Sequence, residues 1–403
     1  MKRSPLTPLF LVIFIDTFGY FLVLPIILRL FINVDSSILP STTSLATRHW
    51  LYGITLSLSP LAFISLSPFI GHLSDTHGRK TVIGACLIAS LLGFILPIIG
   101  IYSKHISLIM IGRFIAGAGT ASQPVAQAAI TDFSTGNKRA FNLSLIGLSM
   151  TLAMVLGPLS GGYLSDPHLV TWFDTTTPYW VGTLLAMINL FFLYTSFEDT
   201  RPIIPVTSKS KRGFSKLFNR PILCLLTVFM VMQLTWSAFY QSSFLFLGNE
   251  YHFSTDTISE FAAAAGLWMC LGLTVIFRAW INLMDTKKIA FISVSMVLVG
   301  FISLYLFNDQ RGIWYCTAPI ALFAGTAYPA LLQVITEHTP AEHQGWMLGV
   351  ASTLLGLAWM ITGIYSVQLA KNSITLLVTL CCTLLSFALI VFLMLRQNHD
   401  SAA

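Results

Sequence analysis

The chain has 403 residues, of which 55% are hydrophobic and only 9% are charged. A soluble domain carries roughly 25% charged residues, so this composition excludes a soluble protein and indicates many membrane-spanning helices. The net charge of +6 resides in loops between apolar runs, which marks membrane orientation and argues against nucleic-acid binding.

Twelve apolar runs are each long enough to cross a bilayer as a helix, which takes roughly 20 residues. The runs do not alternate apolar and polar residues, which excludes a membrane β-barrel. We therefore predict an all-α polytopic membrane protein with twelve transmembrane helices. The predicted spans are 7–32, 50–70, 81–102, 106–131, 141–164, 178–198, 221–246, 258–280, 289–307, 313–336, 345–370 and 373–396.

Basic residues gather at the predicted loops on one side of the membrane, which places both termini in the cytoplasm. The stretch 199–220 is polar and holds six of them, and it indicates a cytoplasmic basic linker on an anionic leaflet. We expect a multi-pass membrane protein. The predicted organisation is a six-helix bundle over 1–198, the linker, and a second six-helix bundle over 221–403.

The two predicted bundles repeat each other in sequence. Asp-Thr followed by Arg-Lys at 75–80 recurs as Asp-Thr-Lys-Lys at 285–288, and Ala-Gly-Thr-Ala at 118–121 recurs at 324–327. These offsets are close to half the chain length, as an internal duplication requires. Two pseudo-symmetric six-helix bundles are the architecture of a transporter that rocks around a substrate path between its halves.

A polar stretch from Gly71 to Lys80 joins the second and third predicted spans. We expect a loop in which Gly71 and Gly78 permit a tight reversal and close helix approach. Arg79 and Lys80 mark the cytoplasmic side. Asp75 is placed to bind the positive N-terminal end of a neighbouring helix. The stretch is therefore a candidate conformational switch, and a solvated loop with a helix cap is the alternative.

Two charged residues lie inside predicted spans. Asp16 lies within the first span, about nine residues from its cytoplasmic end, where an ionised and unpaired carboxylate is costly. Arg113 lies within the fourth span and needs a partner, for which Asp16 and the backbone carbonyls of a kinked helix are the candidates. Asp16 and Arg113 are the candidate proton-coupling residues. A buried acid that caps a neighbouring backbone is the alternative for Asp16.

Small residues punctuate the fourth and fifth spans. Steps of three and four from Arg113 reach Gly117, Thr120 and Pro124, a stripe that faces protein or a cavity and not lipid. The fifth span contains a proline that bends a helix and glycines that let another helix lie against it. These candidate residues are Gly157, Pro158, Gly161 and Gly162.

The candidate substrate-binding residues are aromatic and amide side chains. In the seventh span Gln233, Trp236 and Tyr240 share one helical face, which suits an amphipathic and partly aromatic solute. Packing or lipid-facing aromatics are the alternative. Weaker candidates are Gln123 in the fourth span, Tyr328 and Gln333 in the tenth, and Trp359 in the eleventh.

These motifs resemble those of the major facilitator superfamily, and within it the twelve-span drug:proton antiporter group that includes the tetracycline exporters. The similar stretches are 71–80, although His72 and Thr76 depart from the usual pattern, 112–117, 157–162, and 16–25 in the first span. The third and ninth spans lack the additional acids of tetracycline exporters, so tetracycline itself is not expected as the substrate.

The resemblance implies proton coupling through Asp16 and Arg113, and a bridge from Asp75 to the start of the eleventh span in the outward-open state. It also implies that the fifth-span motif belongs to an exporter. We therefore predict a monomeric, proton-coupled secondary transporter that exports small amphipathic molecules, as in multidrug or metabolite efflux, by alternating access. Its partners are a small-molecule substrate, protons and the lipid bilayer, and the resemblance implies the bacterial inner (cytoplasmic) membrane.

Other classes fit the sequence less well. A superfamily importer or exporter of a specific metabolite or siderophore remains the alternative, because one fold serves both directions. A non-transporting receptor would have no use for Asp16 and Arg113. No spacing typical of an enzyme, a cofactor or a metal site is present, so none is expected. The six cysteines lie in apolar runs and indicate small core residues: Cys86, Cys224, Cys270, Cys316, Cys381 and Cys382.

Overall fold

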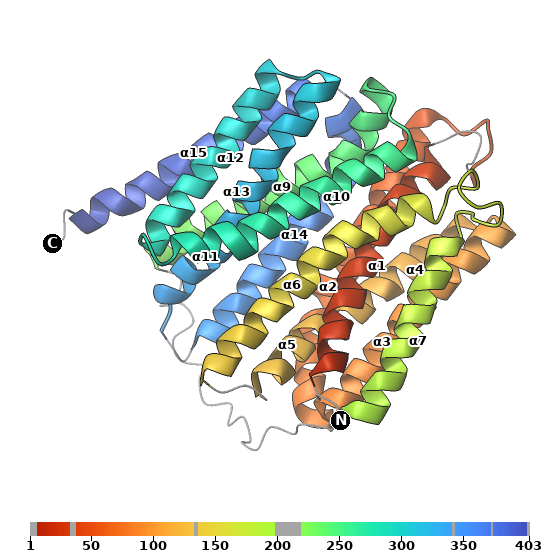
Figure 1. Ribbon diagram of the computed structural model, residues 1–403, viewed down its shortest axis with the longest axis horizontal. Helices are drawn as coiled ribbons and strands as arrows, with labels where there is room; N and C mark the ends of the chain where they lie inside the picture. The colour runs from red at the N-terminus through yellow and green to blue at the C-terminus, as the bar shows by residue number, and fades with distance from the viewer. Residues whose placement is uncertain are drawn as a thin grey trace. The chain divides into compact units, whose positions relative to one another are not determined.

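The computed structural model describes residues 6–32, 38–132, 136–197, 219–340, 343–371 and 374–400, and within these ranges it contains helices and no strands (Figure 1). The helices up to residue 196 are α1 (Thr7–Phe31), α2 (Leu45–His77), α3 (Arg79–Ser103), α4 (Ile106–Thr120), α5 (Ser122–Asp132), α6 (Gly136–Tyr163) and α7 (Thr177–Ser196). The later helices are α9 (Arg220–Glu250), α10 (Thr255–Leu271), the π-helical turn η1 (Gly272–Ile276), α11 (Phe277–Trp280), α12 (Thr286–Leu306), α13 (Gln310–Glu337), α14 (Gln344–Lys371) and α15 (Ile374–Asp400).

The prediction of an all-α polytopic membrane protein is confirmed. Eleven of the spans formed by the described residues are long and apolar enough to cross a membrane. The eighth is continuous from Thr255 to Trp280, with the π-helical turn η1 inside it. The fourth predicted span, 106–131, is the exception, because it divides at Ala121 into α4 and α5 and neither piece reaches membrane length.

The expected loop from Gly71 to Lys80 is wrong in extent. Helix α2 continues through this stretch to His77, and α3 begins at Arg79. The chain reverses at Gly78, whose φ of 93° lies in the region that favours glycine. Gly71 lies within α2 and a Cβ there would touch nothing within 4 Å, so close helix approach does not explain it.

The chain divides into two compact units. The first contains Met1–Ile203 with two later segments, Leu247–Ala264 and Gly363–Val367, and the second contains the rest. The first unit therefore includes parts of α9, α10 and α14, which the predicted boundaries place in the C-terminal bundle. Most of the predicted linker 199–220 lies outside the described residues, as do the basic side chains near residue 138.

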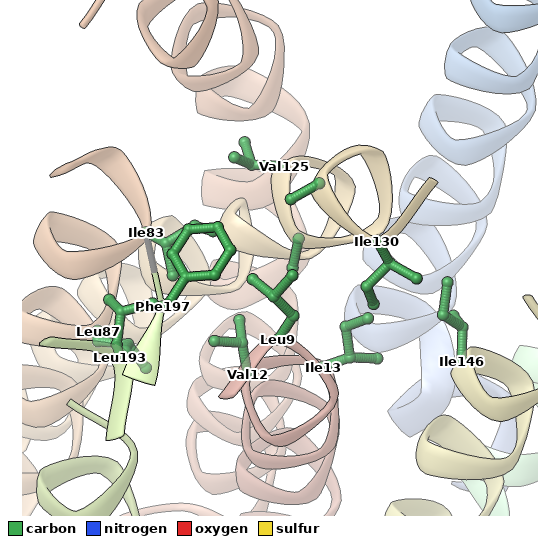
Figure 2. Close-up of a cluster of buried hydrophobic side chains, with 12 residues drawn as sticks. Leu9, Val12, Ile13, Ile83, Leu87, Val125, Ile130, Ile146, Leu193 and Phe197 are labelled. Atoms are coloured by element: carbon green, nitrogen blue, oxygen red, sulfur yellow. The ribbon is translucent and has the colours of Figure 1, made fainter. Parts of the chain in front are cut away.

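The first unit is built around α1. This helix is buried on nearly all sides, with 83% of its most apolar window inside the protein, and it packs against α6, α7, α5 and α2. Figure 2 shows Leu9, Val12 and Ile13 in a buried apolar cluster. The partners come from α3, α5, α6 and the end of α7, among them Leu87, Val125, Ile130, Ile146 and Phe197. The cluster fills the N-terminal half of α1 and ends one helical turn before Asp16.

Candidate functional site

Asp16 lies on α1, one turn beyond the apolar cluster, and only 3% of its surface is exposed. Its carboxylate accepts two hydrogen bonds from hydroxyl groups of other helices. Ser90 Oγ of α3 donates to Oδ1 at 3.3 Å, and Ser122 Oγ at the start of α5 donates to Oδ2. The acid is therefore held by neutral groups that can either donate or accept a hydrogen bond.

The break between α4 and α5 brings Ser122 to the acid. Pro124 has no N–H, so it cannot bond the carbonyl of Thr120 as a continuous helix requires. The N–H of Ala121 bonds the carbonyls of Ala118 and Gly119 and not that of Gly117. The hydroxyl of Thr120 donates a hydrogen bond to the Gly117 carbonyl instead, at 2.8 Å.

The first two residues of α5 bond two consecutive residues of α1. Ser122 donates to Asp16, and Gln123 Nε2 donates to Thr17 Oγ1 at 3.1 Å. The structure therefore places the weaker substrate candidate Gln123 in a contact between helices. The start of α5 is fastened to α1 at the acid itself.

The end of α4 is fastened to other helices through glycines. A Cβ on Gly117 would lie 2.2 Å from the carbonyl oxygen of Ser59 in α2. A Cβ on Gly119 would lie 2.2 Å from Ser90 Oγ and 2.9 Å from the carbonyl oxygen of Cys86, both in α3. Only glycine permits these approaches, and the one at Gly119 makes room for the hydroxyl that holds Asp16.

Arg113 lies in α4 with 2% of its surface exposed. Its guanidinium carbon lies 5.3 Å from the centre of the Tyr20 ring, a cation–π distance. Its Nε and Nη2 atoms are buried and find no hydrogen-bond partner among the described residues. Both expected partners, the Asp16 carboxylate and kink-freed carbonyls, are therefore absent for these two nitrogens, and an aromatic face takes their place.

Asp16 and Arg113 line one cavity inside the first unit. Its volume is about 20 Å³, room for roughly one water molecule. The lining mixes apolar and polar side chains: Ile15, Asp16, Gly19, Tyr20, Val23, Ser59, Ser90, Gly93, Phe94, Arg113, Ala116 and Thr120. The acid and the arginine thus line the same small cavity without forming a direct ion pair.

The candidate switch residues lie at the turn between α2 and α3. Asp75 is exposed, whereas Arg79 is buried and its guanidinium lies 3.5 Å from the carbonyl oxygen of Val125 in α5. Lys80 Nζ donates to the carbonyl of Tyr194 in α7 at 3.1 Å and lies over its ring. The two basic residues therefore connect the start of α3 to its neighbours.

The glycines of the fifth-span motif make close contacts between α6 and two other helices. A Cβ on Gly157 would lie 2.7 Å from Phe21 Cβ, and one on Gly161 would lie 2.1 Å from the carbonyl oxygen of Leu22, both in α1. The next residue, Gly162, faces α10, where its Cβ would lie 2.3 Å from Ser259 Oγ. Pro158 lies within α6 between these contacts.

The aromatic candidates of the seventh span lie in α9, within the second unit. The rings of Trp236 and Tyr240 are 5.7 Å apart, and Tyr240 lies 6.0 Å from Trp359 of α14. Trp236 Nε1 is buried and has no acceptor in the described part of the chain. Gln233 is buried on the same helix, 5% exposed.

The two candidates of the tenth span, Tyr328 and Gln333, have different surroundings in the structure. The ring of Tyr328 of α13 lies 6.0 Å from that of Phe229 in α9. Gln333 bonds Glu337 one turn along its own helix at 3.0 Å.

Sequence reasoning missed the hydroxyl and amide partners of these residues. Ser90 and Ser122 hold Asp16, and in the second unit Gln241 Nε2 donates to Thr362 Oγ1 at 2.7 Å. Thr362 Oγ1 in turn donates to Ser237 Oγ at 3.0 Å. Serine and threonine are common in membrane helices, so only the position of Ser122 two residues before Pro124 could have singled it out.

A buried acid and a buried arginine lie inside a protein whose described residues form eleven helices of membrane length, which is the setting of a membrane transporter with a charged internal site. The sequence profile of the Major Facilitator Superfamily matches residues 9–363. The chain therefore belongs to the major facilitator superfamily, and it is a membrane transporter and not an enzyme.

Similar proteins are known for both the sequence and the fold. The Tetracycline resistance protein, class B, of Escherichia coli is 25% identical over 356 residues, which cover 84% of this chain and 81% of that protein. A crystal structure of a D-xylose-proton symporter covers 96% of this chain and 97% of its own, with a TM-score of 0.76 at 14% identity. The crystal structure of the human organic anion transporter MFSD10 (TETRAN) covers 97% and 99%, with a TM-score of 0.73 at 16% identity.

Proposed function

We propose that the chain is a proton-coupled secondary transporter that exports small amphipathic molecules by alternating access. The observation that carries the proposal is the buried pair Asp16 and Arg113 on one cavity without an ion pair between them. The names of the related tetracycline resistance proteins support export of a small molecule. For this chain, both the class of the exported solute and the coupling to protons are part of the proposal.

The setting of Asp16 suits a group that gains and loses a proton. An ionised side chain deep in a membrane costs about 2.5–3.5 kcal/mol or more. A direct ion pair with Arg113 would hold the acid permanently charged. Hydroxyl partners do not hold Asp16 in one protonation state, because Ser90 and Ser122 can donate to a carboxylate or accept from a carboxylic acid. Both protonation states therefore keep hydrogen bonds in this site.

Arg113 supplies a positive charge that responds to the state of Asp16. Its cavity-lining position and its two unpaired nitrogens let it stabilise a nearby carboxylate through one water molecule. The ring of Tyr20 stabilises the guanidinium when Asp16 is neutral. Proton uptake at Asp16 favours one conformation of the transporter and substrate binding favours the other, which couples the two movements.

The proposed substrate class follows from the second unit. Trp236, Tyr240 and Trp359 form an aromatic group, with the buried indole N–H of Trp236 ready to donate a hydrogen bond. Aromatic faces with a few polar atoms suit a planar, partly aromatic solute with an acceptor atom. We further propose that both termini lie in the cytoplasm, on the basis of the loop charges. The similarity to a tetracycline resistance protein of Escherichia coli supports a location in the bacterial inner membrane.

The test uses purified protein in liposomes that contain a trapped pH-sensitive dye. A proton gradient is imposed, and tetracycline, ethidium and D-xylose are added separately as solutes. We expect solute-dependent proton flux with an aromatic solute, and its loss in Asp16→Asn, which retains size but cannot exchange a proton. Full proton-driven transport by Asp16→Asn would sink the proposal.

The control variant is Asp309→Asn, which also removes one carboxylate. Asp309 caps α13 by accepting from the N–H of Gly312 at 2.8 Å, and asparagine caps a helix about as well as aspartate. We expect this variant to transport at the wild-type rate. Flux that follows D-xylose alone would replace the exporter by a sugar symporter.

A further inference from the structure

The fourth span is held by different helices on the two sides of its break. On the α4 side, the glycines at 117 and 119 pack against backbone atoms of α2 and α3. On the α5 side, Ser122 and Gln123 bond Asp16 and Thr17 of α1. Between them, Ala121 is the single residue outside both helices. The attachment to α1 therefore begins where the regular helix is interrupted.

We propose that Ser122 is a positioning residue that ties the protonation state of Asp16 to the bend between α4 and α5. The inference rests on the proposed function, since it gives the proton on Asp16 a structural consequence. When Asp16 is ionised, Ser122 at the start of α5 donates its hydrogen bond to a charged acceptor. When Asp16 is neutral, this hydrogen bond is weaker and α5 can turn relative to α4.

Two physical effects act in the same direction at this junction. A hydrogen bond to an ionised acceptor is roughly twice as strong as one between neutral groups. The first turn of a helix also carries unpaired N–H groups and a partial positive charge, which attract a carboxylate and not a carboxylic acid. Asp16 contacts the first residue of α5, so both effects are lost when the acid is protonated.

The packing beside the break explains why the response would be local. Gly117 and Gly119 leave no space for α4 to move against α2 and α3 without separating backbone atoms. Thr120 already satisfies the Gly117 carbonyl that the break exposes, at 2.8 Å. The first turn of α5 is held by side chains: the two bonds to α1, and Arg79 of α3, whose guanidinium lies 3.5 Å from the Val125 carbonyl oxygen.

Ser90 offers a matched comparison. It also donates to Asp16, from α3 at 3.3 Å, but it lies far along the chain from the break. Loss of either hydroxyl removes one hydrogen bond from the acid. Only loss of the Ser122 hydroxyl disconnects the acid from α5.

Among the described residues, the titratable groups that interact with Asp16 or Arg113, or with their neighbours, belong to three side-chain classes. Cys86 of α3 interacts with Asp16 electrostatically, and Tyr20, Tyr52 and Tyr179 from α1, α2 and α7 surround the Arg113 guanidinium or one another. Thiols, phenols and guanidinium groups as classes lose their protons only above about pH 8. A response at lower pH is therefore assigned to the carboxyl group.

The experiment measures amide hydrogen exchange over 119–130 in full-length protein in lipid nanodiscs as a function of pH, corrected for the intrinsic exchange rate. No substrate and no gradient are present, so the result does not depend on transport. In the wild type we expect exchange at the start of α5 to rise about tenfold as Asp16 becomes protonated, the factor that one hydrogen bond to a charged group supports. Asp16→Asn should remove this pH response.

The decisive comparison is between Ser122→Ala and Ser90→Ala. We expect Ser122→Ala to lose the response and Ser90→Ala to keep it with a displaced midpoint, while Ser122→Thr, which retains the hydroxyl, restores it. Ser122→Cys, with a weak donor, serves if the alanine variant does not fold. A full response in Ser122→Ala or Ser122→Cys, or equal losses in both alanine variants, would overturn the inference.

The outcome is separable from the proposed function. A wild-type protein that moves no protons in liposomes would refute the transporter mechanism, even if α5 still responds to pH. Proton flux that depends on Asp16, together with an unresponsive α5, would refute the role of Ser122 and leave the mechanism intact.

Discussion

Gly119 sets the position of one of the two hydroxyls that hold Asp16. A Cβ at this position would lie 2.2 Å from Ser90 Oγ and 2.9 Å from a backbone carbonyl that cannot move aside. We expect Gly119→Ala to displace Ser90, to lower the melting temperature, and to reduce proton-coupled transport at least several-fold. Overpacking of this kind costs typically 1–3 kcal/mol. Thermal melting and liposome flux measure the two effects.

The matched control is Gly349→Ala, because a Cβ on Gly349 of α14 would touch nothing within 4 Å. Its flux should equal that of the wild type, and its melting temperature should be equal or slightly higher, because alanine favours a helix more than glycine does. Gly71→Ala serves as a second control for stability alone, since Gly71 is helical and its Cβ also meets open space. If the Gly119→Ala variant has the same melting temperature as these controls, the close approach at Gly119 does not affect stability.

Asp174 stabilises the start of α7 outside the membrane spans. Burial alone would raise the pKa of this carboxyl, but hydrogen bonds from Thr176 and Thr177 hold the pKa below its ordinary value. Its Oδ1 accepts from the backbone N–H groups of both threonines, at 2.8 and 3.0 Å. A group whose pKa is depressed on folding stabilises the protein above its unfolded pKa and loses that effect as the pH falls through its folded pKa.

We therefore expect Asp174→Ala to be less stable than the wild type at neutral pH, by about 1 kcal/mol as for a lost helix cap. The difference in melting temperature should shrink below about pH 4 and vanish once the wild-type carboxyl is protonated. A stability difference that persists unchanged in acid would show that Asp174 acts through packing and not through its charge.

At the scale of helices, α6 and α10 approach closely at Gly162 and Ser259. A Cβ on Gly162 would lie 2.3 Å from Ser259 Oγ and 2.7 Å from Ser259 Cβ. We expect Gly162→Ala to destabilise the protein by about 1–3 kcal/mol, as overpacking does. Adding Ser259→Gly removes the atoms in conflict and should restore part of the melting temperature. Equal melting of the single and double variants would contradict the assigned contact.

The helix pattern was largely predictable from sequence, because long apolar runs leave few alternatives. Eleven predicted spans correspond to single continuous spans of the structure. The extension of α2 through Gly71 to His77 was not predicted, because a short polar stretch reads as a loop although it continues a helix. The break at Ala121 was also missed. Pro329 lies at a nearly matching place in α13, which stays continuous, so a proline alone does not predict a break.

The candidate site was predictable in its charges and not in its contacts. The sequence located Asp16 and Arg113, since charged residues are rare in apolar spans. Their hydroxyl partners on α3 and α5 depend on packing between segments more than 70 residues apart, and no local pattern marks them. The Tyr20 ring beside the Arg113 guanidinium was not predicted for the same reason, because this neighbour is visible only in three dimensions.

At the scale of the whole molecule, the first unit holds segments from both halves of the sequence. Tyr163 Oη at the end of α6 donates a hydrogen bond to Glu260 Oε1 of α10 at 2.6 Å. A Cβ on Gly53 of α2 would lie 3.0 Å from the carbonyl oxygen of Gly363 in α14, so these two helices also approach closely. Alternating access requires contacts between the sequence halves to open and close. These contacts are among the candidates for such opening and closing that lie within the first unit.

We expect a cleavable crosslink between Tyr163→Cys and Glu260→Cys, in a background without the six native cysteines, to stop transport. Reductive cleavage of the crosslinker should restore it. Each single-cysteine variant treated with the same reagent is the control and should remain active. Undiminished flux in the crosslinked double variant would show that α6 and α10 do not separate during the cycle.

The break in the fourth span also bears on how the protein is made. Helix α4 has 15 residues and α5 has 11, about 23 and 17 Å at 1.5 Å per residue, each short of a bilayer core of about 30 Å. Arg113 adds about 2.5–3.5 kcal/mol to the cost of insertion. During synthesis this segment should therefore enter the membrane poorly by itself and efficiently when α3, joined to it by the turn at Lys104, precedes it. Glycosylation mapping of residues 104–134 with and without α3 measures that dependence, and equal insertion in both cases would contradict it.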